Sequence, residues 1–165
     1  MPSVTAISVH SGEPLRLSPP KYKPEITAAF DDIFKVFYHL DGPFFMMEVG
    51  DGVVTLELKP WDGGIRLSLI SVPEQFRGKG YASKAMKVLT QIADKHGVKM
   101  TLDAAPQGDD GLNKAQLFKW YERHGFHRLP YTMQKKLSDA MERPPKKLAA
   151  IVRDMLKVAS EVLSS

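Results

Sequence analysis

The sequence contains no cysteine among its 165 residues. Disulfides, thiolate metal sites and a cysteine nucleophile are therefore excluded, which fits a cytoplasmic protein. No apolar run approaches the roughly 20 residues that a membrane helix needs, so we expect no membrane contact. The first residues lack the charged and apolar regions of a signal peptide. Acidic side chains number 19 against 23 basic ones. This small excess permits an anionic partner such as nucleic acid, although a solvated surface explains it more simply.

The composition is that of a soluble globular protein, with 43% hydrophobic and 25% charged residues. Residues 1–24 hold five prolines and a short β-branched run, which predicts an edge strand and an irregular arm. Residues 25–137 alternate between helical and strand patterns and predict one α/β domain. Residues 138–165 predict a helical extension.

Hydrophobic spacing and turn signals predict the order of elements within the domain. A Gly-Asp-Gly hairpin turn and short links join three strands into an antiparallel meander, and a helical crossover then leads to a strand parallel to the third. The predicted elements are a helix from Pro24 to about residues 39–43, strands at 44–49, 53–58 and 65–72, a helix at 79–96, a strand at 98–104, a helix at about 112–124 and a last short strand at 131–137.

Two glycines and two cations stand where strand 65–72 is followed by helix 79–96. Residues 75–80 of this turn read Gln-Phe-Arg-Gly-Lys-Gly. The first N–H groups of a helix lack partners, the helix dipole favours negative charge there, and glycine lets a ligand approach the backbone. We therefore expect an anion site that suits a pyrophosphate. A tight turn that needs glycine for steric reasons alone is the alternative, since neither the Walker motif nor the dinucleotide fingerprint is present.

The spacing Gln75-x-x-Gly78-x-Gly80 resembles the acyl-CoA motif Q/R-x-x-G-x-G/A of the GNAT superfamily of N-acetyltransferases. A second segment is similar to the family sequence in which a tyrosine, here Tyr121, lies four residues before Gly-Phe. The order of predicted elements over roughly residues 25–136 is also similar. The resemblance implies an α/β (α+β) fold, with a mixed, mostly antiparallel sheet, splayed parallel central strands and flanking helices. The C-terminal amphipathic helix lies outside it.

The resemblance also implies acetyl-CoA as co-substrate. In the family, main-chain N–H groups of the turn and helix start bind the CoA pyrophosphate. That role is carried here to Arg77, Gly78, Lys79, Gly80 and Tyr81, with Gln75 bracing the turn. Pantetheine would lie between the splayed strands, where main-chain groups near Ile70 and Val72 would hold it and polarise the thioester carbonyl.

Acid and base candidates follow from the same resemblance. Tyr121 would give a proton to the departing CoA thiolate, although an aromatic in this helix also fits a purely structural place in the core. The family often uses a glutamate or ordered water on the central strands to deprotonate the amine. Glu48 and Glu57 are the candidate bases, because both have apolar neighbours in the sequence and burial would raise the pKa of either one. Alternatively, Glu57 is an outward-facing residue of an alternating strand.

Two features depart from the family pattern. An asparagine that contacts pantetheine commonly lies seven residues before the tyrosine, but Lys114 is at that position and Asn113 precedes it. One residue is a 100° turn of a helix, so a shifted helix start is needed to bring Asn113 to the ligand. The segment after Gly125 and Phe126 is short, which predicts a reduced final hairpin.

The expected function is transfer of an acetyl group from acetyl-CoA to a primary amine on a small molecule or protein, without a covalent acetyl-enzyme. Two alternatives stay open: a CoA-binding or non-catalytic interaction module, and an enzyme that acts on aminoacyl-tRNA. No histidine spacing predicts a metal site. The apolar stripe of residues 148–162 predicts a helix that packs on its own domain or forms a homodimer contact.

Overall fold

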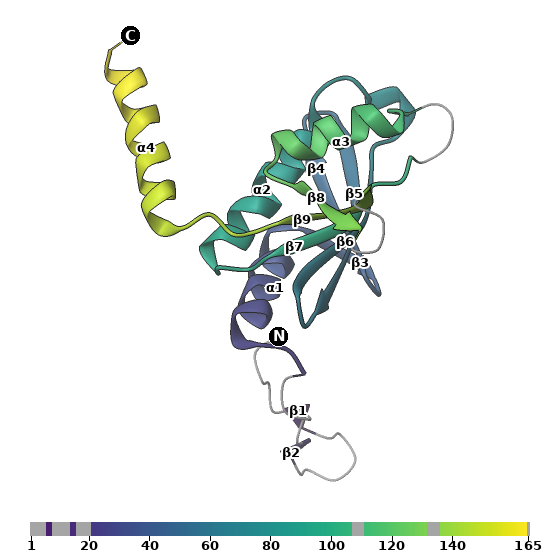
Figure 1. Ribbon diagram of the computed structural model, residues 1–165. Helices are drawn as coiled ribbons and strands as arrows, with labels where there is room; N and C mark the ends of the chain where they lie inside the picture. Colours follow the sequence, from purple (N-terminus) through teal and green to yellow (C-terminus); the bar gives the residue numbers. More distant parts are fainter. Residues whose placement is uncertain (1–5, 8–13, 16–20, 107–110, 132–135, 165) are drawn as a thin grey trace.

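The computed structural model describes residues 6–7, 14–15, 21–106, 111–131 and 136–164 (Figure 1). Its main feature is a seven-stranded sheet in the order β3-β4-β5-β6-β7-β9-β8. The strands are β3 (Tyr38–Asp41), β4 (Phe44–Val49), β5 (Gly52–Trp61), β6 (Gly64–Ser71), β7 (Met100–Asp103), β8 (His127–Tyr131) and β9 (Lys136–Arg143). Within the described residues only the β6–β7 pair is parallel, so the predicted mixed, mostly antiparallel sheet is confirmed.

Helices α1 (Pro24–Val36) and α2 (Tyr81–Lys95) pack on this sheet, and α3 (Lys114–Arg123) packs on β8. Each helix places one apolar face against the strands, as the helical spacing predicts. Along β5, buried Val54, Leu56 and Leu58 alternate with half-buried residues that point to the other face of the sheet. One continuous core results, and Tyr121 and Phe126 belong to it.

The parallel strands β6 and β7 pair through only two rungs, Ile65 with Met100 and Arg66 with Thr101. Ser68 is the extra residue of a β-bulge, because Leu58 of β5 pairs with Leu67 while the preceding residue pairs with Leu69. A bulge bends its strand and increases the local twist. Within the described residues β6 therefore leaves β7 at the bulge, as the predicted splay requires.

The predicted helix end at residues 39–43 is wrong. Helix α1 ends at Val36, and residues 38–41 form β3, the edge strand beside β4. The turn between them is closed by Gly42, which has a φ of +51° and whose N–H donates to the Asp41 carboxylate at 2.8 Å. An Asp-Gly hairpin signal therefore ended the helix early, and the meander has four strands.

The predicted reduction of the final hairpin is also wrong. Strands β8 and β9 form an antiparallel pair, and β9 continues to Arg143, beyond the expected single strand at 131–137. Residues 132–135 of that predicted strand lie outside the described residues. Met141 and Arg143 are buried while Ala140 and Glu142 are half-buried, so strand alternation extends the sheet into the segment assigned to the helical extension.

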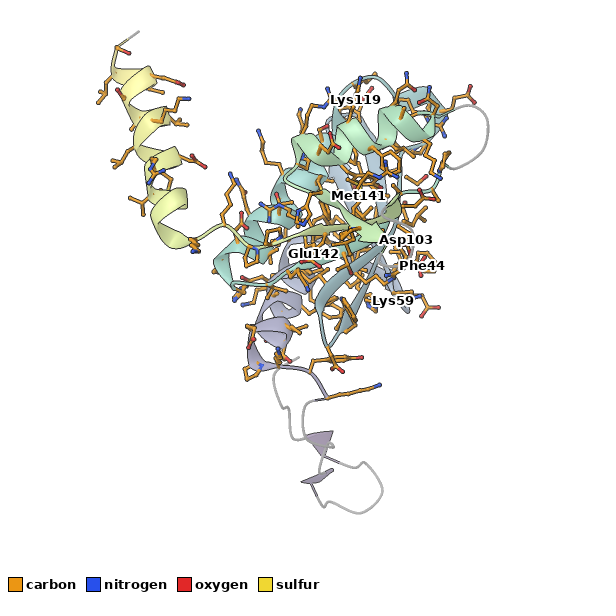
Figure 2. The ribbon with its side chains drawn as sticks, in the orientation of Figure 1. Phe44, Lys59, Asp103, Lys119, Met141 and Glu142 are labelled. Atoms are coloured by element: carbon orange, nitrogen blue, oxygen red, sulfur yellow. The ribbon has the colours of Figure 1, made fainter. Side chains whose placement is uncertain are left out.

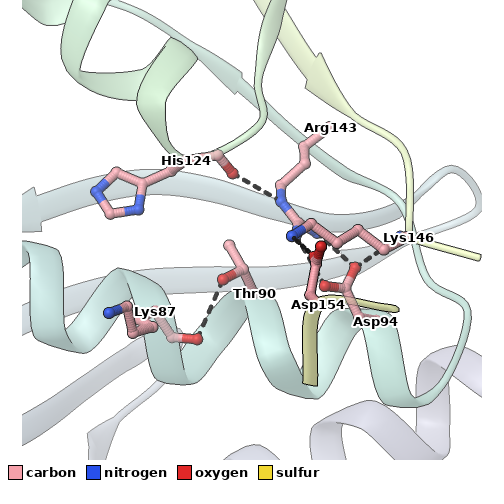
Figure 3. A network of polar contacts seen from close by, with 7 residues as sticks. All are labelled: Lys87, Thr90, Asp94, His124, Arg143, Lys146 and Asp154. Carbon is pink, nitrogen blue, oxygen red and sulfur yellow. Dashed lines mark hydrogen bonds and ion pairs between the residues drawn. The ribbon is translucent and has the colours of Figure 1, made fainter. Parts of the chain in front are cut away.

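At the end of β9, Arg143 forms a buried ion pair with α2 and a hydrogen bond with the residue that follows α3 (Figure 3). The Arg143 guanidinium donates two hydrogen bonds to the Asp94 carboxylate of α2, at 2.8 and 2.9 Å, and its Nε donates to the His124 carbonyl after α3 at 2.8 Å. Asp94 also accepts from the Lys146 N–H at 2.8 Å. Arg143 is 4% exposed, so these contacts satisfy a charge inside the protein.

The two ends of the chain lie outside this body. Strand β1 (Ala6–Ile7) pairs with β2 (Pro14–Leu15) in a separate two-stranded sheet, and most of the predicted arm lies outside the described residues. Helix α4 (Leu148–Leu163) extends away from the sheet in Figure 1, and its residues 152–164 are exposed. The expected packing of this helix on its own domain is therefore wrong. Among the described residues, no helix is long and apolar enough to cross a membrane.

Candidate cofactor and active site

The turn after β6 has the backbone of an open cradle. A short 3₁₀ turn (Glu74–Phe76) leads to Gly78 and Gly80, which have φ values of +79° and +78°. L-residues with side chains rarely adopt such angles. A Cβ built at either glycine would meet no atom of the described residues within 4 Å. These glycines are therefore required by backbone conformation, and the space beside them is open to a ligand.

The N-terminus of α2 meets this space. Its N-cap is Gly80, and in the part of the chain that the structure describes no side chain caps it. The first helical hydrogen bond runs from the Lys84 N–H to the Gly80 carbonyl at 3.1 Å. The N–H groups of the first helical turn, residues 81–83, therefore have no partner inside the helix. Together with the helix dipole, they make this end of α2 suitable for an anion.

The two cations of the turn are held by neighbouring groups. The Arg77 Nε donates to the Val72 carbonyl at 3.0 Å and so ties the turn back to the end of β6. The Lys79 ammonium lies 3.0 Å from the Asp51 carboxylate of the β4–β5 hairpin. Gln75, which was expected to brace the turn, is exposed. The described side-chain contacts of this turn include those from Arg77 to the Val72 carbonyl and from Lys79 to Asp51.

Asp51 was not predicted as a site residue, because nothing in a hairpin turn signals a partner 28 residues away. Its carboxylate accepts hydrogen bonds from the Tyr81 hydroxyl and the Lys79 ammonium, and these lower its pKa. The same carboxylate raises the pKa of Lys79. The side chains of Lys79 and Tyr81 thus fix the start of α2 on the hairpin, and their main-chain N–H groups remain at the cradle.

The gap between β6 and β7 opens beside the cradle. After the bulge, β6 continues from Leu69 to Ser71 without pairing to β7 in the part of the chain that the structure describes. Ile70 and Val72 are half-buried and pack against the core. At about 3.3 Å per residue, the span from Leu67 to Val72 is roughly 17 Å. The main-chain groups on this edge of β6 could pair with an extended arm that carries amide groups, such as pantetheine.

Tyr121 is the buried residue of α3. It is 8% exposed and packs edge-on against Trp120 and Phe126, with ring centroids 5.0 and 5.7 Å away. Burial raises the pKa of Tyr121 to about 12. The Trp120 Nε1 donates to the Ser83 hydroxyl at 3.1 Å, which brings this part of α3 against the first turn of α2.

The two predicted bases lie on the sheet face that points away from α2. Glu48 is exposed on β4, so the burial expected for it is absent. Glu57 of β5 is 20% exposed at its side chain and forms an ion pair with Lys59 at 2.8 Å. Phe44 is the cross-strand neighbour of Glu57, and Figure 2 labels Phe44 and Lys59. Glu57 is the more enclosed of the two carboxylates.

Asn113 serves as the N-cap of α3. Its side-chain oxygen accepts the Gln116 N–H at 2.9 Å, and the Gln116 side chain accepts the Asn113 N–H at 2.9 Å, which is a capping box. Lys114, at the family's asparagine position, forms an ion pair with Asp139 at 2.6 Å. Among the described residues, no group of three histidine or acidic side chains is placed to hold a metal ion.

Comparison with known proteins agrees with this geometry. Residues 15–126 match the family model described as the acetyltransferase (GNAT) family. The chain belongs to the GNAT acetyltransferase family. The matched residues contain the cradle, the splayed strands and Tyr121. No curated protein matches the chain.

Several solved structures are similar to this chain. The ribosomal-protein-S18-alanine N-acetyltransferase from Escherichia coli is 16% identical, with 72% of this chain and 87% of that chain covered and a TM-score of 0.48. Ard1 from Thermoplasma volcanium is 18% identical, with coverage of 64% and 72% and a TM-score of 0.47. The anti-CRISPR protein AcrVA5 is 19% identical, with coverage of 61% and 98% and a TM-score of 0.45. The family assignment rests on the family model.

Proposed function

We propose that the protein is an N-acetyltransferase that moves an acetyl group from acetyl-CoA to a primary amine by direct transfer. The observation that carries this proposal is the uncapped N-terminus of α2 beside two parallel strands that separate after two rungs. Acetyl-CoA supplies the activated acyl group. The N–H groups at residues 78–83 bind its pyrophosphate, and the unpaired edge of β6 near Ile70 and Val72 receives the pantetheine arm.

Transfer then needs a free amine and a stabilised leaving group. The amine nitrogen attacks the thioester carbonyl, the carbon–sulfur bond breaks, and CoA leaves as a thiolate. In this proposal Glu57, which is half-buried on β5, takes the amine proton, either directly or through water. Holding amine and thioester in one gap provides much of the acceleration by proximity.

Tyr121 acts on the leaving sulfur in this proposal. With a pKa of about 12, its hydroxyl stays protonated throughout the neutral range. An ordinary thiol has a pKa of about 8.5, so the thiolate is the weaker base. The Tyr121 hydroxyl therefore stabilises the developing charge chiefly as a hydrogen-bond donor, and the rate does not fall through ionisation of Tyr121 below about pH 10.

The test is release of free thiol from acetyl-CoA with a panel of amines, polyamines, peptides and charged tRNA. Tyr121→Phe is expected to lower kcat by about 100-fold or more while acetyl-CoA still binds. Tyr22→Phe is the matched control, because Tyr22 packs at the edge of the core before α1. If Tyr121→Phe retains full activity, the assigned role is wrong.

The same panel separates the alternatives. An interaction module would bind acetyl-CoA without releasing thiol with any acceptor. An enzyme acting on aminoacyl-tRNA would depend steeply on salt, since phosphate contacts release counterions. The surplus of four positive charges is small, and no aromatic and basic interleaving accompanies it. We therefore favour an amine on a small molecule or a protein.

A further inference from the structure

The C-terminal helix α4 has an apolar face that lies in solvent. Residues 152–164 are exposed, and the helix extends away from the sheet in Figure 1. At 3.6 residues per turn, the apolar side chains of this segment occupy a single arc of roughly 160° around the helix. The large side chains of this apolar face are Val152, Met155, Leu156, Val158, Val162 and Leu163.

A helix of this kind depends on a partner for its stability. Helix α4 has 16 residues, four of which are β-branched and lower its helix propensity. In proteins most helical stability comes from packing of an apolar face, and short isolated helices are marginal in water. Contiguous exposed apolar surface also marks sites of interaction. We therefore expect a partner to cover the apolar face of α4.

The domain of the same chain contacts α4 through the opposite, polar side of the helix. The Lys146 ammonium lies 3.0 Å from the Asp154 carboxylate, and the Lys146 N–H donates to Asp94 of α2 at 2.8 Å (Figure 3). Asp154 lies about 120° around the helix from the middle of the apolar face. These contacts hold the polar side of α4 near the end of α2, and the apolar face stays in solvent.

The charges of α4 restrict the kind of partner. Arg153 and Lys157 balance Asp154 and Glu161, so the helix has no net charge. A helix that lies on a membrane surface typically carries lysine and arginine on its polar face and aromatic side chains on the other. The sequence of α4 contains no aromatic residue. An anionic membrane or a nucleic acid is therefore disfavoured, and a second neutral amphipathic helix is favoured.

We infer that α4 pairs with α4 of a second copy of this chain, with the two helices parallel. Val152, Met155, Ala159 and Val162 follow one another at spacings of three, four and three residues. This is the spacing of the a and d positions of a coiled coil, where side chains of one helix insert between those of the other. We call these four residues the seam. The flanking leucines and Val158 widen the apolar contact on both sides.

The distribution of charge favours the parallel arrangement. On the polar side of α4, Arg153 and Lys157 occupy one half and Asp154 and Glu161 occupy the other half. In a parallel pair with a two-fold axis along the helices, the acidic half of one helix faces the basic half of its copy. An antiparallel pair would place like charges on the same side. Exposed pairs of this kind contribute little affinity and mainly determine orientation.

This inference does not rest on the proposed function. Helix α4 lies beyond residues 15–126, which match the family model. The dimer could therefore form whether or not the protein transfers an acetyl group.

Analytical ultracentrifugation of the full chain measures the association. The wild-type protein is expected to reach the mass of a dimer between about 1 µM and 1 mM. Met155→Gln/Val162→Gln places a polar amide twice in the seam of each copy and should raise the dissociation constant at least about 100-fold. The matched control is Lys157→Gln/Ser164→Gln, which changes two exposed residues of the polar side and should dimerise as wild type does.

Disulfide cross-linking measures the orientation. Because the chain has no cysteine, single variants such as Met155→Cys and Val162→Cys can report which residues meet. A parallel pair places each of these residues opposite its own copy, within the roughly 4.4–6.8 Å between Cα atoms that a disulfide spans. Both variants should therefore form covalent dimers on oxidation, whereas Lys157→Cys should not. The two positions are about 10 Å apart along the helix, so an antiparallel pair could cross-link only one of them.

Four outcomes would overturn the inference. A wild-type chain that stays monomeric up to about 1 mM has no such contact. If the Met155→Gln/Val162→Gln variant dimerises as wild type does, another surface forms the dimer. Cross-linking of only one cysteine variant, or equal cross-linking of Lys157→Cys, contradicts the parallel seam. Binding of a monomeric full chain to phosphatidylglycerol vesicles would mean that a membrane covers the apolar face instead.

Discussion

Removal of the Arg143 guanidinium should destabilise the whole fold. Arg143→Met deletes two hydrogen bonds to Asp94 and one to the His124 carbonyl, all at 2.8–2.9 Å. Arg143 is 4% exposed and Asp94 is 10% exposed at its side chain, so the Asp94 carboxylate would keep a buried charge. Among the described residues, the Lys146 N–H would be its remaining hydrogen-bond donor. Breaking a buried ion pair on one side costs about 3–5 kcal/mol. That is a large part of the roughly 5–15 kcal/mol that typically stabilises a domain.

Thermal and urea unfolding of the full chain measure this loss. A domain of this length loses about 2–4 °C in Tm per kcal/mol, so a fall of about 6–20 °C is expected. The double variant Arg143→Met/Asp94→Leu removes the stranded charge and should recover most of the stability. Arg153→Met is the control, because Arg153 is exposed on α4. If Arg143→Met lowers the free energy of unfolding by less than about 1 kcal/mol, the Arg143–Asp94 ion pair does not hold the end of β9 in place.

Three further predictions concern acid stability, the cradle and α4. Hydrogen bonds from Lys95 and His96 lower the pKa of Asp32 to about 2, so the stability that these bonds contribute is present above pH 4 and is lost as the pH falls towards 2. In urea unfolding, the Asp32→Asn variant should be less stable than wild type at pH 6 and equal to it near pH 2. Gly80→Val should weaken acetyl-CoA binding, measured by calorimetry, by at least about tenfold. The control is Gly97→Val, because Gly97 has a similar positive φ (+65°) at the other end of α2. This control should lose a similar amount of stability but bind acetyl-CoA as wild type does. Deletion of residues 148–165, which include α4, should leave acetyl-CoA binding unchanged. If the full chain is a dimer in light scattering, the shortened chain should be a monomer. A full chain that is already monomeric would exclude a dimer contact through α4.

Most of the fold could be predicted from local signals. The apolar stripe of α2 and the alternation along β5 each identify one element and its buried face, and the helical crossover identifies β7 as parallel to β6. Strand β3 was missed because its four residues are all exposed, so no alternation marks it and only the Asp-Gly turn signals it. The final hairpin was missed because β9 buries a charged residue, Arg143, at a position where an apolar one marks a strand.

The candidate site, like the fold, could be predicted only in part from the sequence. The glycine cradle is visible in the sequence because a positive φ demands glycine at fixed spacing. The contact between Lys79 and Asp51 joins residues 28 positions apart, and no local pattern reports it. Such pairings depend on tertiary packing, which neither periodicity nor turn chemistry encodes.

The central claim is that the N-terminus of α2 and the gap beside β6 bind acetyl-CoA. Titration of the ¹⁵N-labelled protein with acetyl-CoA tests it most directly, by following backbone amides in solution. We expect the largest shifts at the amides of Gly78, Gly80, Tyr81 and Ile70. These shifts should saturate with one dissociation constant and should be absent with ATP or NAD. Saturable binding that moves other amides and leaves these four in place would contradict it.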